Sequence, residues 1–196
     1  MSRENNLVSV DFETYYDTEY SLRKMSVRNY LRDPRFDAYL VAVYDGDGIN
    51  YTGHPSGFDW SRLDGMTLCA HNASFDEQVY RRLVELNVVK TPVKNCSWVC
   101  TADLAAWLGV KRDLASASRY LLGEELSKAV REAMKGRTAP DCLSDPDVIA
   151  YGNRDAVTCY RLAEKYLDAW PAPEREISRL NREAGYRGMA LDVPLV

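Results

Sequence analysis

The sequence is poor in the residues from which several common kinds of active site are built. It has only two histidines, His54 and His71, so a histidine-based triad or a histidine-ligated zinc site has little material. The number of cysteines is odd and no CxxC pair occurs, which argues against a disulfide framework or a zinc site and favours reduced packing residues. These cysteines are Cys69, Cys96, Cys100, Cys142 and Cys159.

Long apolar runs and an excess of positive charge are also missing. No run is long enough to cross a bilayer, and the polar start of the chain lacks a signal peptide's apolar segment, so we expect a cytoplasmic protein without a membrane partner. The net charge of -4 argues against binding of nucleic acid by bulk positive charge, but not at a site where metal ions supply that charge. The 196 residues fit one full domain, or one domain and the beginning of a second.

One short stretch, residues 7–14, combines a buried strand with a pair of acids. Its sequence, LVSVDFET, predicts a strand on which Asp11 and Glu13 point to one face while Phe12 points to the other. Two carboxylates at one strand end repel each other unless a divalent cation lies between them, so we expect a magnesium or manganese site. Asp-x-Glu pairs are also common on solvated surfaces, so the prediction requires further acids to meet this pair.

The rest of the chain alternates strand and helix patterns, which predicts an α/β fold with a mixed sheet of about five strands flanked by helices. We expect four further strands, at residues 37–44, 49–52, 66–70 and 95–99. We expect helices at residues 18–32, 72–87, 101–109, 113–122, 124–135, 144–166 and 174–184, and a loop at 136–140. The basic residues Lys128, Arg131, Lys135 and Arg137 fit either a solvated surface or, less readily, a nucleic-acid path.

Two later segments place further polar side chains beside predicted elements. Asn72 or Ser74 can cap the helix that follows the fourth strand. Asn72 and Asp76 are four residues apart, so they project from one side if the helix has already begun at Asn72. Asp76 would be a third acid at the end of a strand. On the last long helix, Tyr151 and Asp155 are four residues apart and share one side.

Together, Asp-x-Glu-Thr, Asn-x-x-x-Asp and Tyr-x-x-x-Asp, in this order, resemble the DEDD superfamily of 3′-5′ exonucleases. Residues 10–15 and 70–76 are most similar to the proofreading exonuclease domain of phage-type family A DNA polymerases, and the resemblance covers about residues 7 to 170. The tyrosine branch is favoured because Tyr151 lies four residues before Asp155. In the histidine branch, a histidine five residues before the last aspartate takes this role, and here that position is Ala150.

The resemblance implies a ribonuclease H-like fold and a pair of divalent ions, Mg²⁺ or Mn²⁺. Asp11 would bridge both ions, Glu13 and Asp155 would complete the shell of the first, and Asp76 would hold the second. Tyr151 would orient the attacking water.

Four further residues would contact the substrate if the resemblance holds. Thr14 and Asn72 would contact the terminal nucleotide, and Tyr15 or Phe75 would stack on a base.

The activity implied is hydrolysis from the 3′ end of single-stranded or frayed DNA, in the cytoplasm of a bacterial or phage-infected cell. Residues 1–170 would form the nuclease domain, and residues 171–196 resemble the lead-in to a polymerase domain, so a polymerase domain or replication protein is an expected partner. Two alternatives remain open: an exoribonuclease of the RNase D kind, and a catalytically silent module that binds DNA or braces a polymerase.

Overall fold

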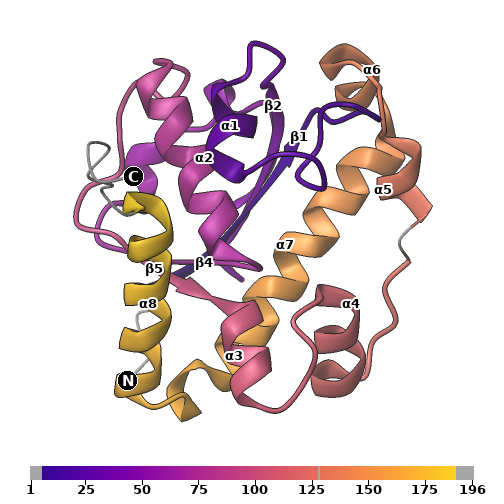
Figure 1. Cartoon of the computed structure of the whole chain (residues 1–196). Coiled ribbons are helices and arrows are strands. Elements are labelled where there is room, and N and C mark those ends of the chain that lie inside the picture. Colours follow the sequence, from indigo (N-terminus) through magenta and orange to yellow (C-terminus); the bar gives the residue numbers. More distant parts are fainter. Residues whose placement is uncertain (1–5, 128, 189–196) are drawn as a thin grey trace, which may run out of the picture.

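The chain forms one mixed five-stranded sheet with helices on both faces (Figure 1), as seen in a computed structural model that describes residues 6–127 and 129–188. The strand order is β3-β2-β1-β4-β5, with β2 antiparallel to β1 and to β3, and with β4 parallel to β1 and to β5. The strands are β1 (Leu7–Thr14), β2 (Ala38–Tyr44), β3 (Asn50–Gly53), β4 (Thr67–Ala70) and β5 (Ser97–Cys100). The predicted α/β fold with a mixed sheet is therefore confirmed.

The two faces of β1 carry different side chains, as the alternation along the strand predicts. Val8, Val10 and Phe12 are buried in the main hydrophobic core, against α1 and α2. Asp11 and Glu13 point to the opposite face, which is covered by α7. The acidic side chains of β1 therefore point from the sheet toward α7, the longest helix.

Helices of very different length surround the sheet. They are α1 (Val27–Arg32), α2 (Ala73–Glu85), α3 (Thr101–Trp107), α4 (Leu114–Ala117), α5 (Ala129–Ala133), α6 (Ala139–Leu143), α7 (Pro146–Tyr166) and α8 (Ala172–Arg187). Short 3₁₀ turns occur at Pro55–Gly57, Trp60–Leu63 and Leu167–Ala169, and one π-helical turn follows α4 at Ser118–Leu122. No helix in residues 6–127 and 129–188 is long and apolar enough to cross a bilayer.

Helix α7 lies close to the sheet because it carries a glycine where it crosses β2. A Cβ atom at Gly152 would lie 2.7 Å from Cδ2 of the buried residue Leu40, which is closer than carbon atoms pack. Any larger residue would therefore push α7 away from β2. Since Gly152 lies between Tyr151 and Asp155, this close approach also sets how near those two side chains come to β1.

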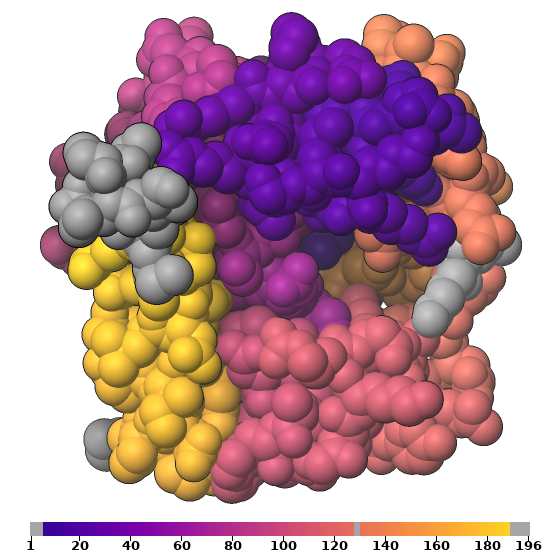
Figure 2. Space-filling model, viewed as in Figure 1, coloured from indigo at the N-terminus to yellow at the C-terminus, as the bar shows by residue number. Residues whose placement is uncertain are grey.

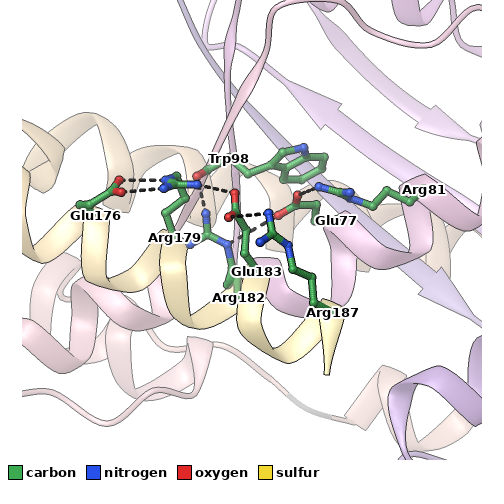
Figure 3. A network of polar contacts seen from close by, with 8 residues as sticks. All are labelled: Glu77, Arg81, Trp98, Glu176, Arg179, Arg182, Glu183 and Arg187. Carbon is green, nitrogen blue, oxygen red and sulfur yellow. Dashed lines mark hydrogen bonds and ion pairs between the residues drawn. The ribbon is translucent and has the colours of Figure 1, made fainter. Parts of the chain in front are cut away.

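The C-terminal helix α8 is attached to the same body by a network of charged side chains (Figure 3). Arg182 donates from Nη2 to the carbonyl oxygen of Trp98 in β5 at 2.6 Å, and its Nε lies 3.6 Å from a carboxylate oxygen of Glu77 in α2. Glu77 in turn pairs with Arg81 at 2.6 Å. The part of the expected C-terminal segment 171–196 that the structure describes thus packs on the sheet, and residues 189–196 lie outside the described residues.

Three predicted helical or loop segments differ from the structure. Residues 18–32 were expected to be one helix, but only Val27–Arg32 is helical, because the Asp17 side chain accepts from the backbone N–H groups of Glu19 and Tyr20 and holds a turn there. Residues 124–135 contain only the short helix α5 within the described chain. The expected loop at 136–140 runs into α6, whose first turn is capped by the Thr138 side chain.

The five cysteines are free thiols, as expected from their odd number and spacing. The sulfur atoms of Cys69 and Cys159 lie 4.0 Å apart between β4 and α7. Both are buried, so they act as packing residues.

Candidate functional site

The acidic end of β1 is open on one side because β1 extends further than its parallel neighbour. Pairing of β1 with β4 stops at Ser9 and Cys69, so the backbone of β1 beyond Ser9 has no strand on that edge. The N–H of Phe12 donates instead to Oδ1 of Asp76 at 3.2 Å. Asp76 lies in the first turn of α2 and is only 3% exposed, so this helix brings a third carboxylate against β1.

Helix α7 brings the fourth acid and the tyrosine from the other side. Its start is fixed by Asp145, whose side chain accepts from the N–H of Asp147, and by Pro146 in the first turn. Tyr151 is buried and Asp155 is half-buried, one turn further along the helix. The three sequence motifs thus lie on three elements that pack together, β1, α2 and α7.

Burial and mutual repulsion affect the ionisation of these carboxylates. Burial, and then the negative charge of Asp155, raise the pKa of Asp11 to about 7. Burial, and then the charge of Asp11, raise the pKa of Glu13 well above its usual range, and Asp155 and Asp76 add to this effect. Each acid therefore makes its neighbours harder to ionise.

The other two acids respond in the same direction. Burial, and then the charge of Asp11, raise the pKa of Asp76, although the Phe12 N–H opposes this. Burial raises the pKa of Asp155, and the nearby Tyr151 hydroxyl and Arg154 guanidinium oppose it. Arg154 lies 3.6 Å from Oδ1 of Asp155. The net result is four acids that are costly to ionise together.

The donor set fits a hard divalent cation. Oδ2 of Asp11 and Oδ1 of Asp155 are buried and accept no hydrogen bond, although Arg154 lies at ion-pair distance from the second of them. Carboxylate oxygens are the ligands that Mg²⁺ and Mn²⁺ prefer, and a cation would remove the repulsion that raises these pKa values. As the side chains stand, however, no three His, Cys, Asp or Glu residues in the described ranges lie close enough together to hold an ion. Binding would require the carboxylates to draw closer around it.

Tyr151 is a hydrogen-bond donor in this site. Burial, and then the charges of Glu13 and Asp155, raise the pKa of its phenol further above the ordinary value of 10. The hydroxyl is therefore protonated at neutral pH and cannot serve as a base. The Arg154 guanidinium lies over its ring, 5.3 Å from the centroid.

Three of the four expected substrate-contacting residues are engaged in packing. The Thr14 hydroxyl is buried 2.7 Å from the Tyr30 hydroxyl, which itself donates to the carbonyl oxygen of Tyr15. The ring of Tyr15 stacks on Tyr20, and the ring of Phe75 lies 6.1 Å from that of Tyr30. This aromatic cluster supports the acidic end of β1, and the partly exposed edges of Tyr15 and Phe75 are what a substrate could reach.

Asn72 differs from the sequence-based expectation. It is the N-cap residue of α2, but its backbone is left-handed (φ 76°) and its side chain makes no capping hydrogen bond; Ser74 lies inside the helix. The helix begins only at Ala73, so the condition under which Asn72 and Asp76 would share one side is not met, and Asn72 is exposed while Asp76 is buried. Because the side-chain amide of Asn72 is exposed, a ligand can reach it.

His71 has a packing role in this structure. Its ring nitrogens lie 3.0 Å from the Thr101 hydroxyl and 2.7 Å from the carbonyl oxygen of Arg112. Burial lowers its pKa to about 4, so the ring is neutral at physiological pH. The second histidine, His54, is exposed just before the 3₁₀ turn Pro55–Gly57.

Arg131 is a site residue that sequence reasoning did not single out. It lies on α5, and its positive charge acts on Asp11, Glu13 and Asp155. In the sequence it is one of four basic residues in a segment without a recognisable motif, and only the folded chain separates it from the others.

Figure 2 shows a hollow on one face of the molecule. The indigo of β1 and the orange of α7 are visible at its floor, and the pink α3–α4 segment lies below it.

A separate cavity of about 400 Å³ lies between α3 and α8, and none of the four acids lines it. Its walls include Asp103, Trp107, Arg112, Trp170, Ile177 and Arg182. Part of this wall is already paired, since Asp103 binds Arg112 and the Ser178 hydroxyl. This cavity is therefore distinct from the acidic site.

Comparison of the chain with protein-family models and with curated proteins gives no match.

Proposed function

We propose that this protein is a metal-dependent 3′-5′ exonuclease that hydrolyses phosphodiester bonds at the 3′ end of single-stranded or frayed DNA. The observation that carries the proposal is the meeting of Asp11, Glu13, Asp76 and Asp155, from three elements distant in the sequence, at the open edge of β1. Clustered buried carboxylates are costly, and a site for cations explains why they lie together.

The sheet supports the finer proposal of a ribonuclease H-like fold. Three antiparallel strands come first in the chain, and two strands parallel to β1 follow on its other side, in the order β3-β2-β1-β4-β5. This order puts β1 at the centre, with its acidic end beside the first turn of α2. Residues 1–170 would make up the nuclease domain, to which α8 is an attached helix.

The chain's own residues would bind the ions and orient the reactants. Asp11, Glu13, Asp76 and Asp155 would be the ligands, and two Mg²⁺ or Mn²⁺ ions, when bound, would neutralise the phosphate and lower the pKa of water. The protonated Tyr151 hydroxyl would hold the attacking water by a hydrogen bond. Asn72, with its exposed amide, would contact the terminal nucleotide, beside the reachable edges of Tyr15 and Phe75.

A digest of labelled oligonucleotides tests the proposal. Matched DNA and RNA strands, labelled at the 5′ end, are incubated with the protein in Mg²⁺, in Mn²⁺ and in excess chelator. A ladder of DNA fragments shortened from the 3′ end, lost with chelator, is the expected result. Preferential digestion of RNA would identify an exoribonuclease of the RNase D kind instead.

A binding control separates a silent module from an inactive preparation. If no strand is cleaved in either metal but DNA is bound, the chain is a non-catalytic module, and the proposed activity is refuted. Glu125→Gln serves as the matched control for variants of the acids, because Glu125 is an exposed carboxylate paired with Arg119. Association with a polymerase or replication protein is a further part of the proposal, tested by co-purification.

A further inference from the structure

The short helix α5 is held at the acidic site by Tyr16, two residues after β1. The Tyr16 hydroxyl donates to the carbonyl oxygen of Arg131, and its own carbonyl oxygen accepts from the N–H of Gly136 at 2.8 Å. On the other side, Met134 is 1% exposed and packs in one cluster with Tyr151. These contacts attach α5 both to the segment that follows β1 and to α7.

Arg131 projects its charge onto the acids without neutralising them. Arg131 lies three residues before the buried Met134, and residues at this spacing share one side of a helix, so Arg131 faces the cluster that contains Met134 and Tyr151. Its positive charge also acts on three of the four acids. Yet in the part of the chain that the structure describes, no carboxylate oxygen comes within 4.0 Å of this guanidinium. An exposed cation therefore stands beside the acids, and within the described residues no carboxylate pairs with it.

Such a cation suits an anion that lies between it and the acids. The phosphates of a nucleic-acid strand are repelled by Asp11, Glu13 and Asp155 and by the net charge of -4 of the protein. A planar guanidinium offers two parallel N–H groups to one phosphate, which a carboxylate-rich site cannot offer. Arg137, which lies just after α5, does not replace it, because it is already paired with Asp145 at 2.8 Å.

We infer that Arg131 binds a backbone phosphate of the nucleic-acid strand whose 3′ end lies at the four carboxylates. This inference rests on the proposed function and assigns α5 as one wall of the substrate path. Arg131 is then a positioning residue: it holds the strand in register, while the acids and Tyr151 act at the scissile bond.

The test measures binding apart from turnover. Fluorescence anisotropy of a labelled single-stranded oligonucleotide in Mg²⁺ is recorded at several salt concentrations, in an Asp11→Asn background that suppresses cleavage and lessens repulsion. Arg131→Ala and Arg131→Lys are compared with Lys135→Ala, which removes the same charge from an exposed residue just after α5. Thermal melts confirm that each variant is folded.

The expected result is specific to a phosphate contact. Arg131→Ala should weaken binding about tenfold to a hundredfold and reduce the slope of log affinity against log salt by about 0.7, the value for one phosphate on a single strand. Arg131→Lys should keep the slope and lose part of the affinity, because the charge remains and the paired N–H geometry does not. Lys135→Ala should leave both unchanged.

Two results would overturn the inference, and they are distinguishable from failure of the proposed function. An unchanged slope and affinity in Arg131→Ala, or an equal loss in Lys135→Ala, refutes the phosphate contact even if the wild-type protein digests DNA. If the wild-type protein neither cleaves nor binds any strand, both proposals fail. Should Arg131→Ala not fold, Arg131→Lys decides: unchanged affinity then refutes a paired contact.

Discussion

Asp11→Asn should stabilise the metal-free protein, and more so at high pH. Burial and the charge of Asp155 raise the pKa of Asp11 from 3.8 to about 7 in the folded state. The folded protein therefore holds this proton more tightly than the unfolded chain does, and ionisation destabilises the fold as the pH rises from about 4 to about 7. Above pH 7 the cost is complete, and asparagine, which cannot ionise, avoids it.

The size of this effect follows from the shift in pKa. About three pKa units correspond to roughly 4 kcal/mol at pH 8, and to less than half of that at pH 5, because the cost builds up over the whole interval between the unfolded pKa and the folded pKa and pH 5 lies in the lower half of it. Even half of the value at pH 8, about 2 kcal/mol, raises the Tm of a chain of this length by roughly 4–8 °C.

The assay is a thermal melt in chelator at pH 5 and pH 8, for the wild-type protein, Asp11→Asn and the control Glu125→Gln. Glu125 is 76% exposed, so its removal should change the Tm little at either pH. A Tm for Asp11→Asn at or below that of the wild-type protein at pH 8 would show that the Asp11 carboxylate is not in a repulsive environment.

Three further predictions concern the ions and α7. Mg²⁺ or Mn²⁺ should raise the Tm of the wild-type protein more at pH 8 than at pH 5, because ions compete with protons for the same carboxylates; an equal rise at both pH values would contradict this. Asp155→Ala should abolish cleavage in the oligonucleotide digest while the far-ultraviolet circular dichroism stays that of a folded protein, whereas retained cleavage would remove Asp155 from the site. Tyr151→Phe should slow turnover at least tenfold yet leave the metal-induced rise in Tm unchanged, since it removes a water-orienting hydroxyl and no ligand; unaltered turnover would exclude its assigned role.

Much of the fold and the acidic set could be predicted because the signals are local. The strand β1 follows from an apolar run and its alternation, which correctly placed Asp11 and Glu13 on the face away from Phe12. The start of α7 follows from the Asp145 cap and Pro146.

The rest depends on contacts between distant segments, which no local pattern reports. The hydrogen bond of Tyr16 to the carbonyl oxygen of Arg131 joins residues 115 positions apart, and such long-range contacts bring Arg131 to the acids. The sequence offers Asn72 or Ser74 as the cap of α2; Asn72 is the N-cap residue, but its backbone is left-handed there and its side chain makes no capping hydrogen bond. The core role of the Thr14 hydroxyl likewise depends on Tyr30, which packs against it from α1.

Direct observation of bound ions tests the central claim, that four carboxylates meet to hold a pair of divalent cations. Crystals of the wild-type protein grown with Mn²⁺ at pH 8 would be measured near the manganese absorption edge. The account predicts two anomalous peaks about 3.5–4 Å apart between β1, α2 and α7, with Asp11 touching both. A complete anomalous data set with no manganese peak beside Asp11, or a structure with Asp155 turned away from the ions, would contradict the claim.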